Sequence, residues 1–360
     1  MAAFSFRHLF RAGLLGIWMS AAAWAADPNA PQPAELEEAL PLLQQYYFNP
    51  SALQAVRSAQ DLPALLPHLR GVAFLNPPEQ EVPIRSELLP GKFGYWRIGS
   101  LAAKDGKELG AELNDWTGHG LRGMIVDLRH CRSGDGGDGF DIAARIASAF
   151  LPDGTLLFSI QALQLPQKLY QTAAVVPHSP FAAPLVVLTD RATDGAAEVL
   201  AEVLRRQAGA IVIGQTTPGD EALFTLAKLK SGRLLRIPIA PVLLPDGTSL
   251  LGTPVAPDIA VYVDDQVQVQ VLAQIALGTA AQGLVEAPTR LRLNENALVH
   301  EENPEIDEIL AEQARAAHKD ASAPLQDLTL MRALDVLKGI TLFPSAAAPE
   351  TAPAVTPGLH

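Results

Sequence analysis

Short apolar runs alternate along the chain with segments in which apolar residues recur every three or four positions. Five of the runs are typical of strands buried on both faces: 93–98, 123–128, 156–160, 185–188 and 210–214. Between them, helical spacing predicts one helix over 140–151 and another that starts after residue 195 and ends near Gly209. Strands that alternate with helices predict an α/β fold, with a largely parallel sheet covered on both faces.

The pattern changes on both sides of this core. Residues 26–90 are Pro-rich, with Leu36, Leu40 and Leu43 at helical spacing, which predicts a partly helical N-terminal segment. Residues 226–257 indicate antiparallel strands around two turns. A C-terminal helical region is expected over 266–343, with helices at 305–318 and 324–338. Residues 344–360 are Ala, Pro and Thr without periodicity, so we expect a disordered tail.

The first 25 residues resemble an export signal. Two arginines precede a short apolar run, and Ala23-Trp24-Ala25 is a small-x-small site that a signal peptidase can cut. The apolar run is shorter than the roughly 20 residues that a spanning helix needs. We therefore expect cleavage near Ala25 and a periplasmic or secreted protein, with no membrane span afterwards.

Charge and cysteine content narrow the possible functions. The formal net charge of -12 argues against binding to nucleic acid or anionic lipid, both of which need clustered Lys and Arg. Cys131 is the single cysteine, so no internal disulfide forms. No pattern indicates a metal site or a cofactor, and the oligomeric state is open.

The stretch TDRATDGAAEVL follows the apolar run 185–188 and opens a helix. The segment PLVVLTD, which leads into this stretch, and four other segments in order resemble the tail-specific, or C-terminal processing, serine peptidase family. The other landmarks are FGYWRIGSL, LRGMIVDLR, AIVIGQTTPG and LLPDGTSLLGTPVAPDIAV. The resemblance runs from about Gly94 to Val261 and implies a ClpP/crotonase-like core over 91–265. The PDZ module of many family members has no counterpart in residues 27–90.

The residues that carry the family's chemistry are replaced. The resemblance puts Gly195 at the position of the nucleophilic Ser, Asp220 at that of the general-base Lys, and Phe224 at that of a Gln that orients this Lys. A Ser-Lys dyad needs a hydroxyl that attacks and a neutral amine that accepts its proton. Glycine has no side chain, and a carboxylate is a much weaker base than such an amine. The family mechanism is therefore not expected here.

The oxyanion-binding backbone belongs to the fold and can survive these losses. Gly134, Gly136 and Ala196 are the candidates for it, the first two because the family's loop after Asp-Leu-Arg supplies such an amide. The same loop also reads as G-x-G-x-x-G and contains one G-G-x-G-x-D copy. Its two aspartates would repel a pyrophosphate, and calcium-binding β-helices repeat the second motif, so neither reading is favoured. A structural helix entry is an equal alternative.

A relocated nucleophile is the main catalytic alternative. Thr193 and Cys131 are the candidates, against roles as a helix cap and a half-buried thiol. Only His130 is near either in sequence, and adjacent side chains usually point apart. Separately, Asp194, Glu198, Asp220 and Glu221 are expected to form an acidic group if the two segments meet. Such a group favours a basic side chain or a divalent cation over an anionic ligand, unless its members point to solvent.

Three functions remain open at this point. The first is an exported pseudopeptidase that binds a peptide or protein partner in the cleft of the family fold. The second is an active serine-type peptidase or other hydrolase with a relocated nucleophile. The third is a carrier of a small hydrophobic ligand, because the resemblance extends to a retinoid-binding protein of the eye that uses this fold without proteolysis.

Overall fold

The computed structural model describes residues 30–75, 84–101, 120–131, 138–162, 166–173, 181–285 and 325–342. The predicted signal peptide, the helix at 305–318 and the tail at 344–360 lie outside these residues. Contacts divide the chain into two units, one of Met1–Pro77 with Thr225–Pro238 and a larger one of Pro78–Phe224 with Ile239–His360. In the described part, no helix combines the length and apolar character that crossing a membrane requires.

A six-stranded sheet is the centre of the larger unit, in the order β11-β8-β7-β4-β3-β2. Its strands are β2 (Arg85–Leu89), β3 (Phe93–Arg97), β4 (Gly123–Asp127), β7 (Leu185–Thr189), β8 (Ile211–Gly214) and β11 (Ile259–Ala260). Neighbours from β3 to β11 are parallel, and β2 pairs antiparallel with β3. Every residue of β3, β4 and β7 is buried, which explains their apolar composition. The predicted parallel sheet and α/β class are confirmed.

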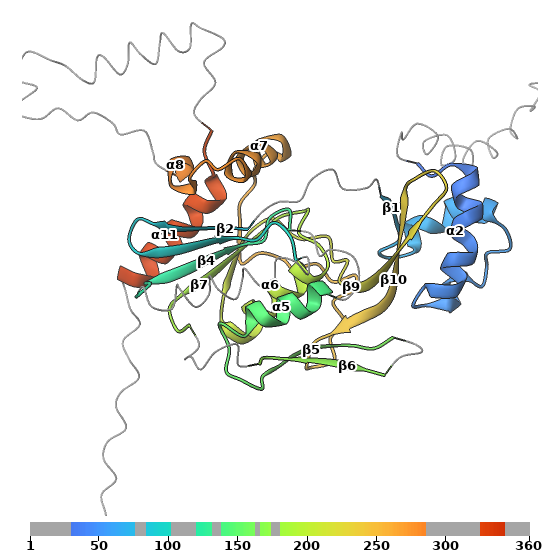
Figure 1. Ribbon diagram of the computed structural model, residues 1–360, viewed down its shortest axis with the longest axis horizontal. Helices are drawn as coiled ribbons and strands as arrows, with labels where there is room; N and C mark the ends of the chain where they lie inside the picture. The colour runs from blue at the N-terminus through green and yellow to red at the C-terminus, as the bar shows by residue number, and fades with distance from the viewer. Residues whose placement is uncertain are drawn as a thin grey trace, which may run out of the picture. The chain divides into compact units, whose positions relative to one another are not determined.

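Helices cover both faces of this sheet (Figure 1). On one face, α5 (Asp138–Ala147) and α6 (Ala196–Ala208) share the main apolar core with the sheet. On the other, α11 (Leu328–Leu342) buries Leu330, Leu334 and Leu337, and α8 (Ala281–Val285) buries Ala281. The helix predicted at 324–338 therefore exists and packs on the core as expected, four residues after its predicted start. A further helix, α7 (Asp265–Ala276), begins at the capping carboxylate of Asp264.

The prediction for residues 156–160 was wrong in one respect. They form β5 (Leu156–Ile160), but this strand pairs antiparallel with β6 (Lys168–Gln171) and β10 (Leu234–Leu243) in a second sheet. A parallel neighbour needs a crossover of about a dozen residues, and the chain from Ile160 to Lys168 is shorter than that. The second sheet also contains β1 (Ala73–Leu75) and β9 (Ala222–Lys228). The strands predicted after residue 225 therefore exist as β9 and β10, which pair with each other.

The smaller unit combines short helices with parts of β9 and β10. Its helices are α2 (Pro33–Tyr46), α3 (Leu62–Leu65) and three 3₁₀ turns at Pro50–Leu53, Ala59–Asp61 and Leu66–His68. Leu36, Ala39 and Leu43 on one face of α2 are buried, which confirms the helical spacing seen in the sequence. The buried Glu35 carboxylate accepts hydrogen bonds from Ser231 and Arg233 and joins α2 to the β9–β10 turn.

Candidate functional site

The turn between β7 and α6 has the backbone form of a nucleophile turn. Gly195 is the N-cap of α6, with φ 55° and ψ -122°. Only glycine adopts a positive φ at little cost, and hydrolases hold their nucleophile on such a strained strand-to-helix turn. Gly195 is itself the N-cap residue and no side chain caps this helix, so the predicted capping role of Thr193 is wrong. The turn is kept without the group that would react.

The segment that follows β8 lies against the first turn of α6. The Glu198 carboxylate accepts the backbone N–H groups of Gly219, at 2.7 Å, and Asp220, at 3.0 Å. The Thr217 hydroxyl is also within reach of Glu198 and accepts the Val255 N–H. Asp220 therefore lies beside the nucleophile turn, where the resemblance puts the base. Phe224 lies in β9.

Three of the four predicted acids come together here. Glu221 is fully buried, and neither of its carboxylate oxygens has a hydrogen-bond partner in the described residues. Burial, together with the charges of Glu198, Glu202 and Asp220, raises the pKa of Glu221 to about 10. Burial also raises the pKa of Glu198 to about 7, against the hydrogen bonds that it accepts. Around neutral pH, Glu221 is therefore an uncharged acid.

The group does not have the arrangement of a metal site. Among the described residues, no three His, Cys, Asp or Glu side chains are placed to hold a metal ion. The fourth predicted acid, Asp194, lies on the part of the turn next to Cys131, since its N–H donates to the Cys131 carbonyl. Of the four acids, Glu198 and Glu221 are buried behind the turn, whereas Asp220 beside them and Asp194 within the turn are partly exposed.

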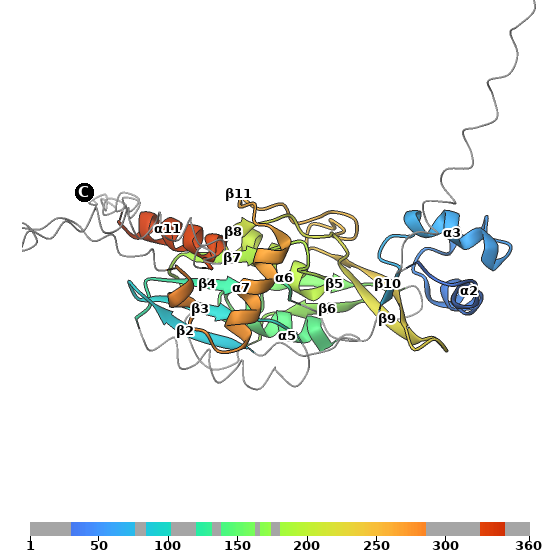
Figure 2. The same cartoon turned by 90° about the horizontal axis from the view of Figure 1, so that it is seen from above.

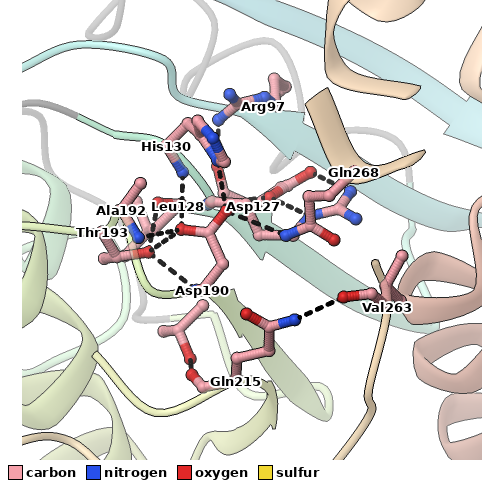
Figure 3. Close-up of polar contacts among 12 residues, drawn as sticks. Arg97, Asp127, Leu128, His130, Asp190, Ala192, Thr193, Gln215, Val263 and Gln268 are labelled. Atoms are coloured by element: carbon pink, nitrogen blue, oxygen red, sulfur yellow. Dashed lines mark hydrogen bonds and ion pairs between the residues drawn. The ribbon is translucent and has the colours of Figure 1, made fainter. Parts of the chain in front are cut away.

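Asp190 is the polar centre at the carboxyl end of β7 (Figure 3). Its carboxylate accepts hydrogen bonds from the Nδ1 and the backbone N–H of His130, from the Ala192 N–H and from the Gln268 amide. Asp190 is 1% exposed. Burial alone would raise its pKa, but the hydrogen bonds and charge of His130 hold the pKa of Asp190 well below its usual range.

His130 is the most unusual residue of the site. Its backbone has φ 50°, a conformation that non-glycine residues seldom adopt and that often marks functional positions. Its side chain is 37% exposed, although Nδ1 is bound to buried Asp190. A histidine held through one ring nitrogen presents the other to a ligand or a water molecule. The sequence indicated no partner for His130 other than the adjacent Cys131, whereas its partner in the structure is Asp190, 60 residues away.

A second residue that the sequence did not indicate comes from α7. Gln268 is buried and donates its amide to Asp190 at 2.9 Å. Close by, the Gln215 amide donates to the Val263 carbonyl before α7 begins. These two bonds attach α7 to the carboxyl edge of the sheet. The pattern of α7 predicts a helix but gives no sign of a polar partner.

Neither candidate for a relocated nucleophile is available. Cys131 is fully buried, and burial raises the pKa of its thiol well above the usual range, which leaves no thiolate. The buried Thr193 hydroxyl donates to the Leu128 carbonyl at 2.9 Å and accepts the Asp190 N–H at 3.0 Å. Both side chains therefore have structural roles.

A buried ion network fixes the strand that carries His130. The Arg129 guanidinium binds Asp127 at 2.7 Å and Asp327, just before α11, at 2.7 Å. The Tyr95 hydroxyl donates to Asp127 at 2.8 Å. Burial opposes charge on Arg129, but the two carboxylates raise its pKa well above the usual value. The Asp-Leu-Arg motif thus ties β4 to α11, and its next residue, His130, points to Asp190.

Among the predicted oxyanion residues, only Ala196 is described. It is the first residue of α6 and is fully buried. Gly134 and Gly136 lie outside the described residues. The first turn of a helix carries the positive end of the helix dipole. The described arrangement thus combines a helix N-terminus, a half-exposed imidazole and a glycine turn, which suits binding of a peptide carbonyl.

Residues 92–261 match the sequence profile of the family described as Peptidase family S41. The chain is 25% identical over 217 residues to a carboxyl-terminal-processing protease of Synechocystis, which covers 60% of this chain and 48% of that protein. It is 23% identical over 182 residues to the carboxy-terminal processing protease CtpA of Bacillus subtilis, covering 51% of this chain and 38% of CtpA. The chain thus spans about half the length, or less, of these curated relatives.

Solved structures with similar folds include proteases. The photosystem II D1 C-terminal processing protease aligns with a TM-score of 0.39 at 24% identity, covering 54% of this chain and 48% of that one. A peptidase-like protein of Parabacteroides merdae aligns with a TM-score of 0.47 at 17% identity, covering 71% of this chain and 100% of that one. The profile match over 92–261 agrees with the limits that the five sequence landmarks predicted, and it confirms the resemblance.

Proposed function

Since residues 92–261 form a peptidase family S41 domain, we propose that this protein binds an extended peptide or a partner protein at the carboxyl edge of the central sheet without hydrolysing it. The observation that carries the proposal is the contrast between backbone and side chains at one turn. Gly195 keeps the geometry of the nucleophile turn, and Glu198 keeps Asp220 beside it, but neither position has a hydroxyl or an amine. The frame for positioning a peptide remains, and the dyad is absent.

The buried acids support the same conclusion. A Lys amine that acts as a base needs a neutral, apolar environment to lower its pKa. Here three carboxyl side chains, Glu198, Glu202 and Glu221, interact electrostatically in the space behind the turn. An amine placed among these acids would take a proton from one of them and form an ammonium–carboxylate pair, because each charge favours the charged form of the other group. The surroundings of Asp220 are therefore unsuited to the family's base, in addition to lacking it.

The first test is proteolysis of an unfolded protein. We expect the purified chain to leave casein intact, and Gly195→Ser to remain inactive because Asp220 supplies no amine. The pair Gly195→Ser with Asp220→Lys is the smallest change that restores both groups of a dyad. Adding Glu221→Gln to that pair removes one buried acid of this cluster and should increase any activity gained. Cleavage of casein by the unmodified chain would contradict the proposal.

One observation favours a second function. His130 held by Asp190 is the arrangement of a general base and its orienting carboxylate, and such a pair can activate a water molecule. In this reading the protein is a hydrolase in which water replaces the serine. His130→Ala separates the two readings, because it abolishes hydrolysis in the second and leaves casein intact in the first. His130→Gln, which retains a hydrogen-bonding side chain, is the matched control for folding.

The third function, a small hydrophobic ligand carrier, has less support. A groove between α5 and β6 is lined by four charged side chains, and hydrophobic ligands prefer predominantly apolar walls. Export and a periplasmic or secreted location stay predictions from the first 25 residues.

A further inference from the structure

A groove of about 700 Å³ lies between α5 and the edge strand β6. Buried Ile142, Ala144 and Tyr170 form apolar walls, and exposed Asp138, Asp141, Arg145 and Lys168 line the rim. None of the groove residues belongs to the site around Gly195 and His130. A volume of this size is within the range of pockets that hold small ligands or short peptide segments. Figure 2 shows α5 beside β5 and β6.

β6 is the last strand of its sheet on this side among the described residues, so one edge of it has no strand partner there. On its inner edge, the Thr172 N–H donates to the Thr155 carbonyl at 2.9 Å, and the Thr172 carbonyl accepts the Gly154 N–H at 3.1 Å. Because alternate residues of an antiparallel strand direct their backbone groups to opposite edges, Leu169 and Gln171 direct theirs to the outer edge.

One hydrogen bond shows that this outer edge faces α5. The Ala173 N–H, which belongs to the same set as Leu169 and Gln171, donates to the Ser148 hydroxyl of the α5 segment at 3.2 Å. Ser148 in turn donates to the Ala144 carbonyl at 2.8 Å. At the other end of the groove, Lys168 bridges to Asp141 at 2.9 Å. These two contacts tie Asp141 and Ser148 of the α5 segment to the strand. The stretch of groove between them is about 10 Å long, as calculated from the helical rise between these two residues.

A helix beside an exposed strand edge is the arrangement in which peptides add to a sheet as an extra strand. We propose that this groove binds an extended segment of a partner protein, which pairs with the outer edge of β6 at Leu169 and Gln171. The length between the two ties accommodates about three extended residues, and the segment continues beyond both ends. Leu169, 54% exposed, supplies an apolar contact on this strand.

The charges that line the groove indicate which residues the bound segment contains. Lys168 already contacts Asp141 and lies over the Tyr170 ring at 4.5 Å, so its ammonium group is paired. Asp138 at the start of α5 lies in the groove without an ion-pair partner in the described residues. The whole chain carries a formal charge of -12, which attracts cationic partners. The segment therefore contains a Lys or Arg that pairs with Asp138. This inference goes beyond the proposed function and does not depend on what happens at Gly195.

The test uses a blocked nonapeptide of alternating Val and Thr with one central Lys, titrated against the full chain by calorimetry. We expect binding that is lost when the peptide is N-methylated on one set of alternate nitrogens and kept when it is methylated on the other set, because only one edge pairs with β6. Replacing the Lys by norleucine should weaken binding about threefold, as expected for a rim ion pair. Absence of binding, or equal binding of both methylated peptides, would overturn the proposal.

Two variants locate the binding. Leu169→Pro removes the outward N–H of β6 and should weaken binding about tenfold, with the Tm showing whether the fold persists. Asp138→Asn should weaken binding of the Lys peptide about threefold and leave the norleucine peptide unchanged. Asp153→Asn, at an exposed position outside the groove, is the matched control. Unchanged binding in both groove variants would contradict the assignment, and a Leu169→Pro chain that does not fold leaves the two methylated peptides to decide.

Discussion

At the scale of single residues, Gly195 and Glu221 carry the proposal that the site binds peptides without cleaving them. Gly195 removes a hydroxyl and relaxes the turn that bears it, because a positive φ suits glycine. Glu221 adds a buried carboxyl without a hydrogen-bond partner in the described residues, an arrangement that costs stability whenever the group ionises. An active centre that depended on a neutral amine here would be impaired by that group. Both changes favour binding over catalysis.

The raised pKa of Glu221 makes stability depend on pH. Its pKa is about 10 in the folded chain and near 4.5 when unfolded, so the folded state holds the proton more tightly. The stabilisation is complete below pH 4.5 and is lost as the pH rises toward 10, by up to about 1.4 kcal/mol per pH unit. Glu221→Gln should remove this loss and raise the free energy of unfolding at pH 8 by about 5 kcal/mol, with little effect at pH 4.

Urea denaturation at both pH values measures this effect. Glu37→Gln, at an exposed position, should leave the pH dependence unchanged and is the control. A Glu221→Gln chain that is less stable than the original at pH 8 would show that the carboxyl has a partner and a structural role.

The thiol of Cys131 should be unreactive in the folded chain. Burial leaves it protonated and out of contact with solvent. We expect a thiol reagent such as dithionitrobenzoate to modify the native protein at least about 100-fold more slowly than the urea-unfolded protein. Rapid labelling of the native chain, with a rate that falls in His130→Ala, would instead revive Cys131 as a nucleophile.

At the scale of elements, α11 is attached to the sheet by a charge network as well as by apolar packing. Arg129 lies between Asp127 and Asp327, and all three are buried. Removing one partner leaves an uncompensated buried charge, which strongly lowers the stability of the folded state. We expect Asp327→Ala to lower the free energy of unfolding by about 3–5 kcal/mol and to speed amide exchange in α11.

Asp335→Ala, on the exposed side of the same helix, is the matched control and should change stability by less than about 0.5 kcal/mol. If Asp327→Ala lowers stability no more than this control, apolar packing alone holds α11 in place.

The elements that local patterning predicted well are those buried by parallel neighbours. β3, β4 and β7 are short, continuous apolar runs because both of their faces are covered, and this pattern alone identified them as buried strands. β5 has a similar composition, but its sheet is decided by the short connection to β6 and by pairing with a strand more than 70 residues later. No local pattern contains that pairing.

The site shows the same division. Gly195, Asp220 and Phe224 could be assigned from sequence because a resemblance fixes their spacing. The His130–Asp190 pair and Gln268 could not, because three elements distant in sequence bring them together. The sequence contains one signal for His130: this residue directly follows the strand that ends in Asp-Leu-Arg, and ligands bind at the carboxyl ends of parallel strands.

At the scale of the whole molecule, the described parts combine a sheet edge that keeps the frame of a peptidase and a separate groove beside β6. Both suit extended chains, and the formal charge of -12 favours basic ones. Under the proposed function, such a protein binds polypeptide segments without cleaving them.

The central claim is that the S41 domain holds peptides and does not cut them. Equilibrium dialysis of the full chain against a library of blocked, Lys- and Arg-containing nonapeptides, read by mass spectrometry on both sides of the membrane, tests binding and cleavage in one sample. We predict that a subset of peptides accumulates on the protein side at full length, and that this subset is unchanged after a day of incubation. Peptide fragments that appear with the original chain and disappear with His130→Ala would contradict the account.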